Sequence, residues 1–192
     1  HPRSKGDTVG RPAVGVDMKI VNSKGQEVPN GESGEIICRG PFLMSGYHQN
    51  EQETETYFRL GDEWGWTGDI AKRDAEGFIT LVGRSKDMII SGGVNIYPRE
   101  VEVVLEQHKK IIDCTVFGIP DKRWGEALVA YVVPRDEKEL TEQEITNYCL
   151  EHLARFKRPK YVKIVDNIAK TPSGKVQKPV LRDAFLNSKN AL

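Results

Sequence analysis

Four short stretches of the sequence combine glycine with charged side chains in ways that could do chemistry. The stretch TPSGK reads as a turn in which Gly174 allows positive φ and Lys175 follows as an ammonium on a flexible stem. An ammonium presented by a turn suits an oxyanion such as a phosphate or a carboxylate. The Walker A nucleotide loop is excluded, because it needs glycine where Ala169 stands and Ser or Thr where Val176 stands.

The other three stretches lie upstream. WTGD ends in Asp69, whose carboxylate follows a glycine and could accept hydrogen bonds from the two vicinal hydroxyls of a ribose. GRSKD carries Arg84 and Lys86, which we expect on the same side of an extended segment because strand side chains repeat every two residues. SGGVNIYP contains Gly92 and Gly93, and adjacent glycines let a ligand approach the backbone closely.

Each stretch also has an ordinary structural interpretation. Taken alone, a Gly-Lys turn or a turn aspartate is typical of a solvated loop, GRSKD of an exposed linker, and paired glycines of a β-bulge. Cys149 and His152 have helical spacing but no further ligands, so they do not indicate a metal site. The basic cluster RFKRPK is typical of a solvated edge, and Trp64 and Trp66 of packing. The order and spacing of the four stretches along the chain must decide between the chemical and the ordinary structural interpretation.

The elements that must position these stretches change character near residue 84. Before it, the sequence predicts strands in VGVDMKIVN and GEIICRG and a short helix in NEQETETYF, capped by Asn50. IAKRDAEGFITLVG predicts a hairpin that turns over residues 74–77. These signals indicate a small β-rich unit.

After residue 84, helices and strands alternate. Pro98 marks a helix start, and Thr141 with Glu144 forms a capping box at another. Strands are predicted in IIDCTVFGIP, ALVAYVVP and YVKIVDNI, and a last helix in PVLRDAFLN. The predicted apolar stripes are Val101, Val104, Leu105 and His108 in the first helix, and Ile145, Tyr148, Cys149, His152 and Phe156 in the second.

Composition excludes several classes of protein. The 192 residues carry 28 basic and 28 acidic side chains, so no global field favours nucleic acid or an anionic membrane. No apolar run reaches the roughly 18 residues of a membrane span, and three cysteines without CxxC spacing indicate neither a disulfide framework nor a zinc site. Cytoplasm is the expected location. Because the chain begins at His1 without methionine, we interpret it as a piece of a longer protein.

The order of these stretches resembles a known family. GEIICRG, WTGDIAKRDAEGFITLVGRSKDMIISGGVNIYPREVE and AKTPSGKVQK are similar to the later core motifs of the adenylate-forming (AMP-binding) enzymes, in particular the acyl-CoA synthetase branch. The resemblance implies an α+β fold. Residues 1–84 would be a barrel-like β subdomain ending the large domain, 85–88 a hinge, and 89–192 a mobile C-terminal lid with a few-stranded sheet flanked by helices.

The resemblance implies roles for matching positions. Asp69 would hold the ATP ribose hydroxyls and Arg84 the ribose and phosphate side of the nucleotide. Lys175 would be the adenylation lysine that bridges the substrate carboxylate and the α-phosphate, where charge builds in the transition state. Lys86 would occupy the hinge. The loop containing Gly92 and Gly93 would approach the pantetheine of coenzyme A, and RFKRPK would lie near the coenzyme A phosphates.

The implied activity is that of an AMP-forming acid–thiol ligase. A carboxylic acid and ATP would form an acyl-adenylate, and coenzyme A would then take the acyl group and release AMP. Mg²⁺ is implied with its ligands mostly outside this chain, as are the phosphate loop and acyl pocket, so we expect these 192 residues alone to be inactive. A homodimer of the intact enzyme is compatible with the resemblance. Two alternatives stay open: a fatty acyl-AMP ligase or other adenylating enzyme that passes its acyl group to a carrier protein, and a non-catalytic binding module.

Overall fold

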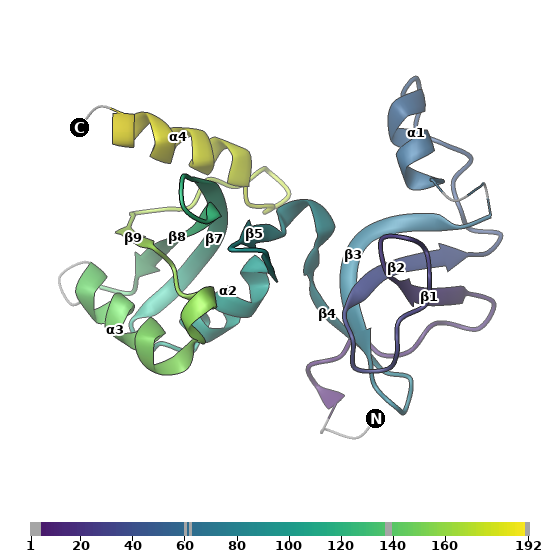
Figure 1. The fold of residues 1–192 in the computed structure, drawn as a ribbon, viewed down its shortest axis with the longest axis horizontal. Helices are drawn as coiled ribbons and strands as arrows, with labels where there is room; N and C mark the ends of the chain where they lie inside the picture. Colours follow the sequence, from purple (N-terminus) through teal and green to yellow (C-terminus); the bar gives the residue numbers. More distant parts are fainter. Residues whose placement is uncertain (1–4, 60, 62, 137–139, 191–192) are drawn as a thin grey trace. The chain divides into compact units, whose positions relative to one another are not determined.

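The computed structural model describes residues 5–59, 61, 63–136 and 140–190. The chain divides into two compact units, His1–Lys86 and Asp87–Leu192. Each unit has a sheet and an apolar core of its own, and Figure 1 shows the strands of both sheets. Among the described residues, none of the helices combines the length and the apolar character needed to cross a bilayer.

The first unit is built on a four-stranded antiparallel sheet whose strands follow the order of the chain (Figure 1). The strands are β1 (Asp17–Val21), β2 (Gly34–Arg39), β3 (Gly65–Arg73) and β4 (Ile79–Arg84). Successive side chains of a strand point to opposite faces, and both faces of this sheet bury apolar groups. One face buries Ile20, Ile36, Ala71 and Ile79, and the other Val21, Ile37 and Trp66.

Two local predictions in this unit are confirmed. Helix α1 (Glu51–Tyr57) begins after Asn50, whose Oδ1 accepts a hydrogen bond from the backbone N–H of Glu53 at 3.2 Å. The hairpin between β3 and β4 turns where expected. There the backbone N–H of Asp74 donates to the Phe78 carbonyl at 3.0 Å, and Asp74 Oδ1 accepts from the Phe78 N–H at 2.9 Å.

The second unit has a five-stranded sheet centred on a long antiparallel hairpin, β7 with β8. β9 adds to β8 in parallel, and the short β5–β6 hairpin joins the start of β8 through the pairing of Ser91 with Gly125. The strands are β5 (Ile89–Ser91), β6 (Val94–Ile96), β7 (Ile111–Asp121), β8 (Gly125–Pro134) and β9 (Tyr161–Ile164).

Helices cover both faces of this second sheet (Figure 1). α2 (Pro98–Glu106) and α3 (Glu142–His152) pack on one face, and α4 (Lys178–Asn190) packs on the other. The alternation along β7 decides this division, because Val116 faces α2 and α3 while Phe117 faces α4. The predicted α+β fold, with a few-stranded sheet flanked by helices, is confirmed.

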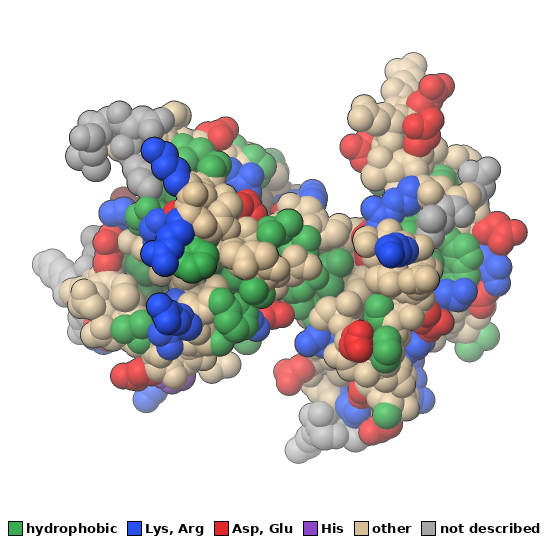
Figure 2. Space-filling view, viewed as in Figure 1, with side chains coloured by type: hydrophobic (Ala, Val, Ile, Leu, Met, Phe, Trp, Pro, Cys, Tyr) green, Lys and Arg blue, Asp and Glu red, His purple; other side chains and the backbone are tan. Residues whose placement is uncertain are grey.

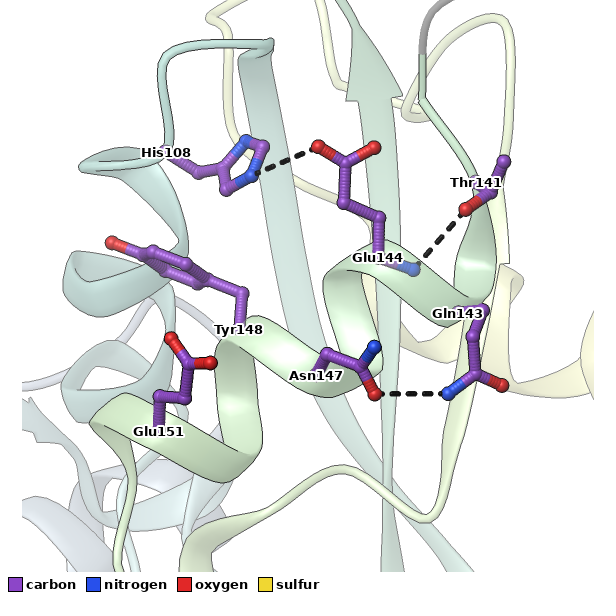
Figure 3. Close-up of a pocket in the computed structure, with 7 residues that line it drawn as sticks. All are labelled: His108, Thr141, Gln143, Glu144, Asn147, Tyr148 and Glu151. Atoms are coloured by element: carbon purple, nitrogen blue, oxygen red, sulfur yellow. Dashed lines mark hydrogen bonds and ion pairs between the residues drawn. The ribbon is translucent and has the colours of Figure 1, made fainter.

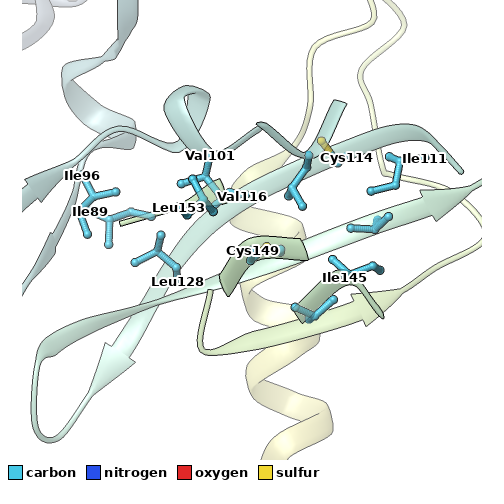
Figure 4. Close-up of a cluster of buried hydrophobic side chains, with 14 of the residues drawn as sticks. Ile89, Ile96, Val101, Ile111, Cys114, Val116, Leu128, Ile145, Cys149 and Leu153 are labelled. Carbon is cyan, nitrogen blue, oxygen red and sulfur yellow. The ribbon is translucent and has the colours of Figure 1, made fainter. Parts of the chain in front are cut away.

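Two cysteines belong to the larger core of the second unit (Figure 4). Burial raises the pKa of the Cys114 thiol to about 12 and that of the Cys149 thiol to about 11. Both thiols therefore stay protonated at neutral pH and act as small apolar groups, because only the thiolate is reactive.

The predicted apolar stripes extend too far in both helices. His108 lies beyond the end of α2, although its side chain is only 12% exposed. α3 ends at His152 because Leu153 adopts an extended conformation, with φ −117° and ψ 140°. Phe156 then falls in the short 3₁₀ turn η3 (Arg155–Lys157) and is 49% exposed. Within α3 only Ile145 and Cys149 are buried.

Candidate functional site

Asp69 is presented by a bulge in β3. Ile37 of β2 pairs with Trp66, but Glu35 pairs with Ile70, so a single β2 residue faces residues 67–69 of β3. The three residues therefore leave the regular ladder. Gly68 takes φ 75°, a conformation that glycine adopts without strain. Bulges that re-aim a side chain are frequent next to active sites.

Side chains replace the ladder hydrogen bonds that the bulge loses. The Thr67 hydroxyl donates to the Ile36 carbonyl at 3.0 Å and accepts from the Asp69 N–H at 3.1 Å. The Gly68 N–H donates to Glu35 Oε1 at 3.1 Å. Because each of these donors has a partner, the bulge is a defined structure and holds Asp69 in one orientation.

Arg84 completes the bulge from the neighbouring strand. It pairs with Asp69 across the β3–β4 ladder, and its Nε lies 2.7 Å from Asp69 Oδ1. Its Nη1 also donates to the Thr67 carbonyl at 3.2 Å. The Asp69 side chain keeps 31% of its surface exposed, so a ligand can reach the carboxylate. The structure thus brings together two predicted site residues, and Arg84 orients Asp69.

A cavity of about 360 Å³ adjoins this bulge within the first unit. Three aromatic side chains and three cationic ones line it, together with two glutamates. Its lining residues are Glu35, Tyr47, Glu53, Thr56, Tyr57, Arg59, Trp66, Thr67, Gly68, Arg84, Ser85 and Lys86.

Lys86 lies in a single 3₁₀ turn, η2 (Ser85–Asp87), at the boundary between the two units. The expected extended segment is therefore wrong, because residues 85–87 form a 3₁₀ turn. Arg84 and Lys86 nevertheless both line the cavity at the bulge.

Gly92 and Gly93 form the two-residue loop of the β5–β6 hairpin. Ser91 pairs with Val94 across the loop, and the two glycines have φ values of 58° and 79°. A tight hairpin loop with positive φ at both central positions favours glycine at each. The paired glycines therefore make a turn and not the β-bulge of the alternative interpretation. A Cβ on Gly92 would lie 3.0 Å from the Trp124 ring, whereas one on Gly93 would meet nothing within 4 Å.

The turn between β7 and β8 holds this glycine hairpin in place. The Gly92 N–H donates to the Trp124 carbonyl at 2.8 Å, and the Ile90 N–H donates to Glu126 Oε2 at 2.7 Å. Asp121 organises the same turn, since its Oδ1 accepts from the backbone N–H of Arg123 at 3.0 Å and of Trp124 at 3.1 Å.

A cavity of about 710 Å³ lies beside the glycine hairpin. Two aromatic side chains in its wall are well exposed, Trp124 at 46% and Phe156 at 49%. Three cations line the same cavity; all three belong to RFKRPK, and Arg155 lies in η3. The lining residues are Ser91, Gly92, Val94, Trp124, Ala127, Leu128, Arg155, Phe156, Arg158 and Lys160. No sequence pattern indicated Trp124, and helical periodicity placed Phe156 in an apolar stripe. Phe156 is exposed because α3 ends before it, where Leu153 becomes extended.

Lys160 lines the cavity beside the glycine hairpin and also forms an ion pair with Asp121. The hydrogen bond from Lys160 is the largest cause that lowers the pKa of Asp121, to about 2, and the backbone N–H groups of Arg123 and Trp124 contribute to the same shift. The same contact raises the pKa of Lys160. One carboxylate therefore links the turn that carries Trp124 to the strand region that carries Lys160.

Lys175 lies at the end of the predicted turn, which the structure confirms. The Gly174 N–H donates to the Thr171 carbonyl at 2.8 Å, and the Thr171 hydroxyl accepts from the Lys175 N–H at 3.1 Å. Two other lysines nearby are engaged, Lys170 with Asp113 and Lys178 with Glu102. Lys175 is exposed and forms no ion pair with any residue that the structure describes.

A further pocket, of about 420 Å³, lies along α3 (Figure 3). His108 Nε2 is 3.7 Å from Glu144 Oε1, and the His108 ring meets Tyr148 edge to face at 4.8 Å. The Glu144 N–H donates to the Thr141 hydroxyl at 3.1 Å, which confirms Thr141 as the helix cap, while the Glu144 carboxylate pairs with Lys110 at 3.0 Å. These contacts stabilise the start of α3 and its packing.

Charge is mixed over the drawn face of each unit. Figure 2 shows Lys and Arg side chains interspersed with acidic and hydrophobic ones. Neither unit therefore presents a field of one sign on this face, and the cations that line the cavity at the glycine hairpin form a local group.

Comparisons with known proteins agree with these features. The family model for the AMP-binding enzyme C-terminal domain matches residues 100–175, and that for the AMP-binding enzyme matches residues 1–48. The oxalate–CoA ligase of Arabidopsis thaliana is 41% identical over 182 residues, which is 95% of this chain and 35% of the relative.

Solved structures of adenylate-forming enzymes have a similar fold. The crystal structure of ATP-bound MatB from Rhodopseudomonas palustris has a TM-score of 0.87 and 34% identity, over 93% of this chain and 36% of that one. The o-succinylbenzoate CoA synthetase (MenE) of Bacillus subtilis, in complex with the acyl-adenylate intermediate OSB-AMP, has a TM-score of 0.85 and 37% identity. It is matched over 94% of this chain and 36% of its own length. The chain spans about a third of the length of the curated relatives it matches and belongs to the AMP-binding, or adenylate-forming, superfamily of enzymes.

Proposed function

We propose that the chain is the C-terminal part of an ATP-dependent acyl-CoA synthetase. In the first half-reaction, a substrate carboxylate attacks the α-phosphate of ATP, an acyl-adenylate forms, and pyrophosphate leaves. In the second, the thiol of coenzyme A attacks the acyl carbon, the thioester forms, and AMP leaves. Residues 1–84 would end the large domain, 85–88 would be the hinge at Lys86, and 89–192 would be the lid.

The nucleotide roles rest on the β3 bulge. Asp69 accepts hydrogen bonds from the ribose hydroxyls, because its carboxylate is held in one orientation yet partly exposed. Arg84 orients that carboxylate and adds positive charge on the phosphate side. Lys175, exposed on a turn with no ion pair among the described residues, stabilises charge on the α-phosphate as the carboxylate attacks.

One observation favours coenzyme A as the acyl acceptor: the cavity beside the glycine hairpin. An exposed Trp124 and Phe156 offer faces for stacking a base, and cations such as Arg158 and Lys160 suit phosphates. A base joined to several phosphates is the nucleotide end of coenzyme A. The pantetheine arm would then pass Gly93, where the backbone is open.

Mg²⁺ has no assigned ligand in this chain. Over the residues that the structure describes, no three His, Cys, Asp or Glu side chains converge so as to hold a metal ion.

The test uses the full-length enzyme that contains this chain, supplied with ATP, coenzyme A and a panel of carboxylic acids. Formation of the coenzyme A thioester together with AMP is expected. Gly93→Asn should then separate the half-reactions, because asparagine tolerates positive φ and the added side chain has room. Pyrophosphate exchange should stay within about twofold of wild type while thioester formation falls about tenfold or more.

Gly31→Asn is the matched control, since Gly31 also has positive φ (89°) and open space but lies in the first unit. It should change neither half-reaction. Acyl transfer to a carrier protein without transfer to free coenzyme A would contradict the proposal, as would equal loss of both half-reactions in Gly93→Asn.

A further inference from the structure

Glu35 lies under the bulge that presents Asp69, and its side chain is only 12% exposed. Both carboxylate oxygens are engaged. Oε1 accepts the Gly68 N–H at 3.1 Å, and Oε2 lies 2.7 Å from Arg59 Nη2. A carboxylate with so little exposure is costly to bury unless charge and hydrogen bonds compensate for lost water. These two contacts supply that compensation.

Arg59 is itself fixed from a second direction. Its guanidinium lies 3.5 Å from the centroid of the Trp66 ring, and Trp66 is 4% exposed. A guanidinium stacked on a ring and paired with a carboxylate has little freedom to move. Arg59 therefore restrains the Glu35 carboxylate, which in turn keeps Oε1 directed at Gly68.

The Gly68 N–H depends on this arrangement because the bulge takes residues 67–69 out of regular pairing between β2 and β3. Its acceptor in the structure is Glu35 Oε1. Removing the acceptor leaves a half-buried donor unsatisfied, and the bulge can then relax toward other conformations. Asp69 follows Gly68 directly, so its carboxylate would lose its orientation.

We propose that Glu35, held by Arg59, is a positioning residue that fixes the bulge so that Asp69 can hold the nucleotide ribose. Glu35 touches neither substrate nor reacting atoms and acts through Gly68 and Asp69. This inference rests on the proposed function, in which Asp69 accepts hydrogen bonds from the ribose hydroxyls.

The experiment measures adenylation by the full-length enzyme with ATP and with 2′-deoxy-ATP, and compares kcat/KM for the two nucleotides. Glu35→Ala should lower the preference for ATP about tenfold by raising KM for ATP, because a misplaced Asp69 no longer distinguishes the hydroxyl. Glu35→Gln has one amide oxygen for two donors, the Gly68 N–H and Arg59, so it should lower the preference by less than Glu35→Ala does. In an enzyme that already carries Asp69→Ala, Glu35→Ala should change the preference no further.

Glu27→Ala is the matched control, since Glu27 forms an ion pair with Arg73 (2.6 Å) in the same unit. It should leave the nucleotide preference unchanged. If Glu35→Ala does not fold, Glu35→Asp replaces it, because the shorter side chain keeps the charge but withdraws the oxygen from Gly68. The same loss of preference is expected.

A Glu35→Ala or Glu35→Asp enzyme with lowered thermal stability but unchanged nucleotide preference would overturn the positioning role. Failure of the proposed function has a different signature. In that case Asp69→Ala itself would leave the preference unchanged, which would overturn the ribose assignment and this inference with it.

Discussion

Among single residues, Lys175 differs from the neighbouring lysines because it forms no ion pair with a residue that the structure describes. Lys170 and Lys178 are engaged in ion pairs, whereas the Lys175 ammonium is exposed at the end of a hydrogen-bonded turn. A preorganised cation contributes most where negative charge increases during the reaction. In the proposed function, that increase occurs when the carboxylate meets the α-phosphate.

We predict that Lys175→Ala in the full-length enzyme slows acyl-adenylate formation about 10²–10³-fold, the range for loss of one preorganised charge or donor. With ready-made acyl-adenylate and coenzyme A, the variant should form thioester at a near-normal rate. Pyrophosphate exchange and single-turnover thioester formation measure the two steps. Lys170→Ala, just before the same turn, is the control and should affect neither step. Equal slowing of both steps by Lys175→Ala would refute the assignment.

At the scale of elements, Asp121 joins the β7–β8 turn to Lys160 and so shapes the cavity beside the glycine hairpin. Its side chain is 8% exposed, and its pKa is lowered to about 2 by the Lys160 hydrogen bond and by two backbone N–H groups. A carboxyl group whose pKa is lower in the folded state than in the unfolded state stabilises the fold while it is ionised. Its contribution is present above about pH 4, the unfolded pKa of aspartate, and is lost as the pH falls toward 2.

Asp121→Asn should therefore remove part of the pH dependence of stability between about pH 4 and pH 2. Urea unfolding of the chain, followed by circular dichroism at several pH values, measures the difference in the free energy of unfolding between variant and wild type. The difference should be largest at and above about pH 4 and shrink toward pH 2. Asp183→Asn, on the exposed surface of α4, is the control, and a pH-independent difference for Asp121→Asn would count against the linkage.

At the scale of the whole molecule, the boundary between the two compact units falls between Lys86 and Asp87, inside the 3₁₀ turn η2. Each unit has its own core, so cleavage at the boundary would leave both cores intact. A hinge at this position would let one lid serve two half-reactions by presenting Lys175 first and the glycine hairpin second.

Limited proteolysis tests the boundary. Trypsin should cut first after Arg84 or Lys86 and release a stable piece that begins close to residue 87, which mass spectrometry identifies. Lys86→Gln should move the cut to Arg84 without changing the size of the stable piece by more than a few residues. Resistance of residues 84–88, with first cuts inside β7 or β8, would argue against a hinge.

The sequence alone determined the features that depend on neighbours in the chain. Asn50, Thr141 and Pro98 mark helix starts because caps are local, and the turn at Gly174 follows from which residues tolerate positive φ. The ordered motifs from WTGD to TPSGK likewise identified the family from the sequence.

Features that join distant parts of the chain depend on tertiary packing. Glu35 and Gly68 lie 33 residues apart, and Asp121 and Lys160 lie 39 apart, so no local pattern pairs them. The same holds for the bulge at residues 67–69, which exists only as a mismatch between two strands. Helical periodicity assigned Phe156 to a buried stripe, but periodicity cannot locate the extended Leu153 that ends the helix. Residue types and their order therefore identified the candidate site residues. Strand register decided which other side chains hold those residues in position.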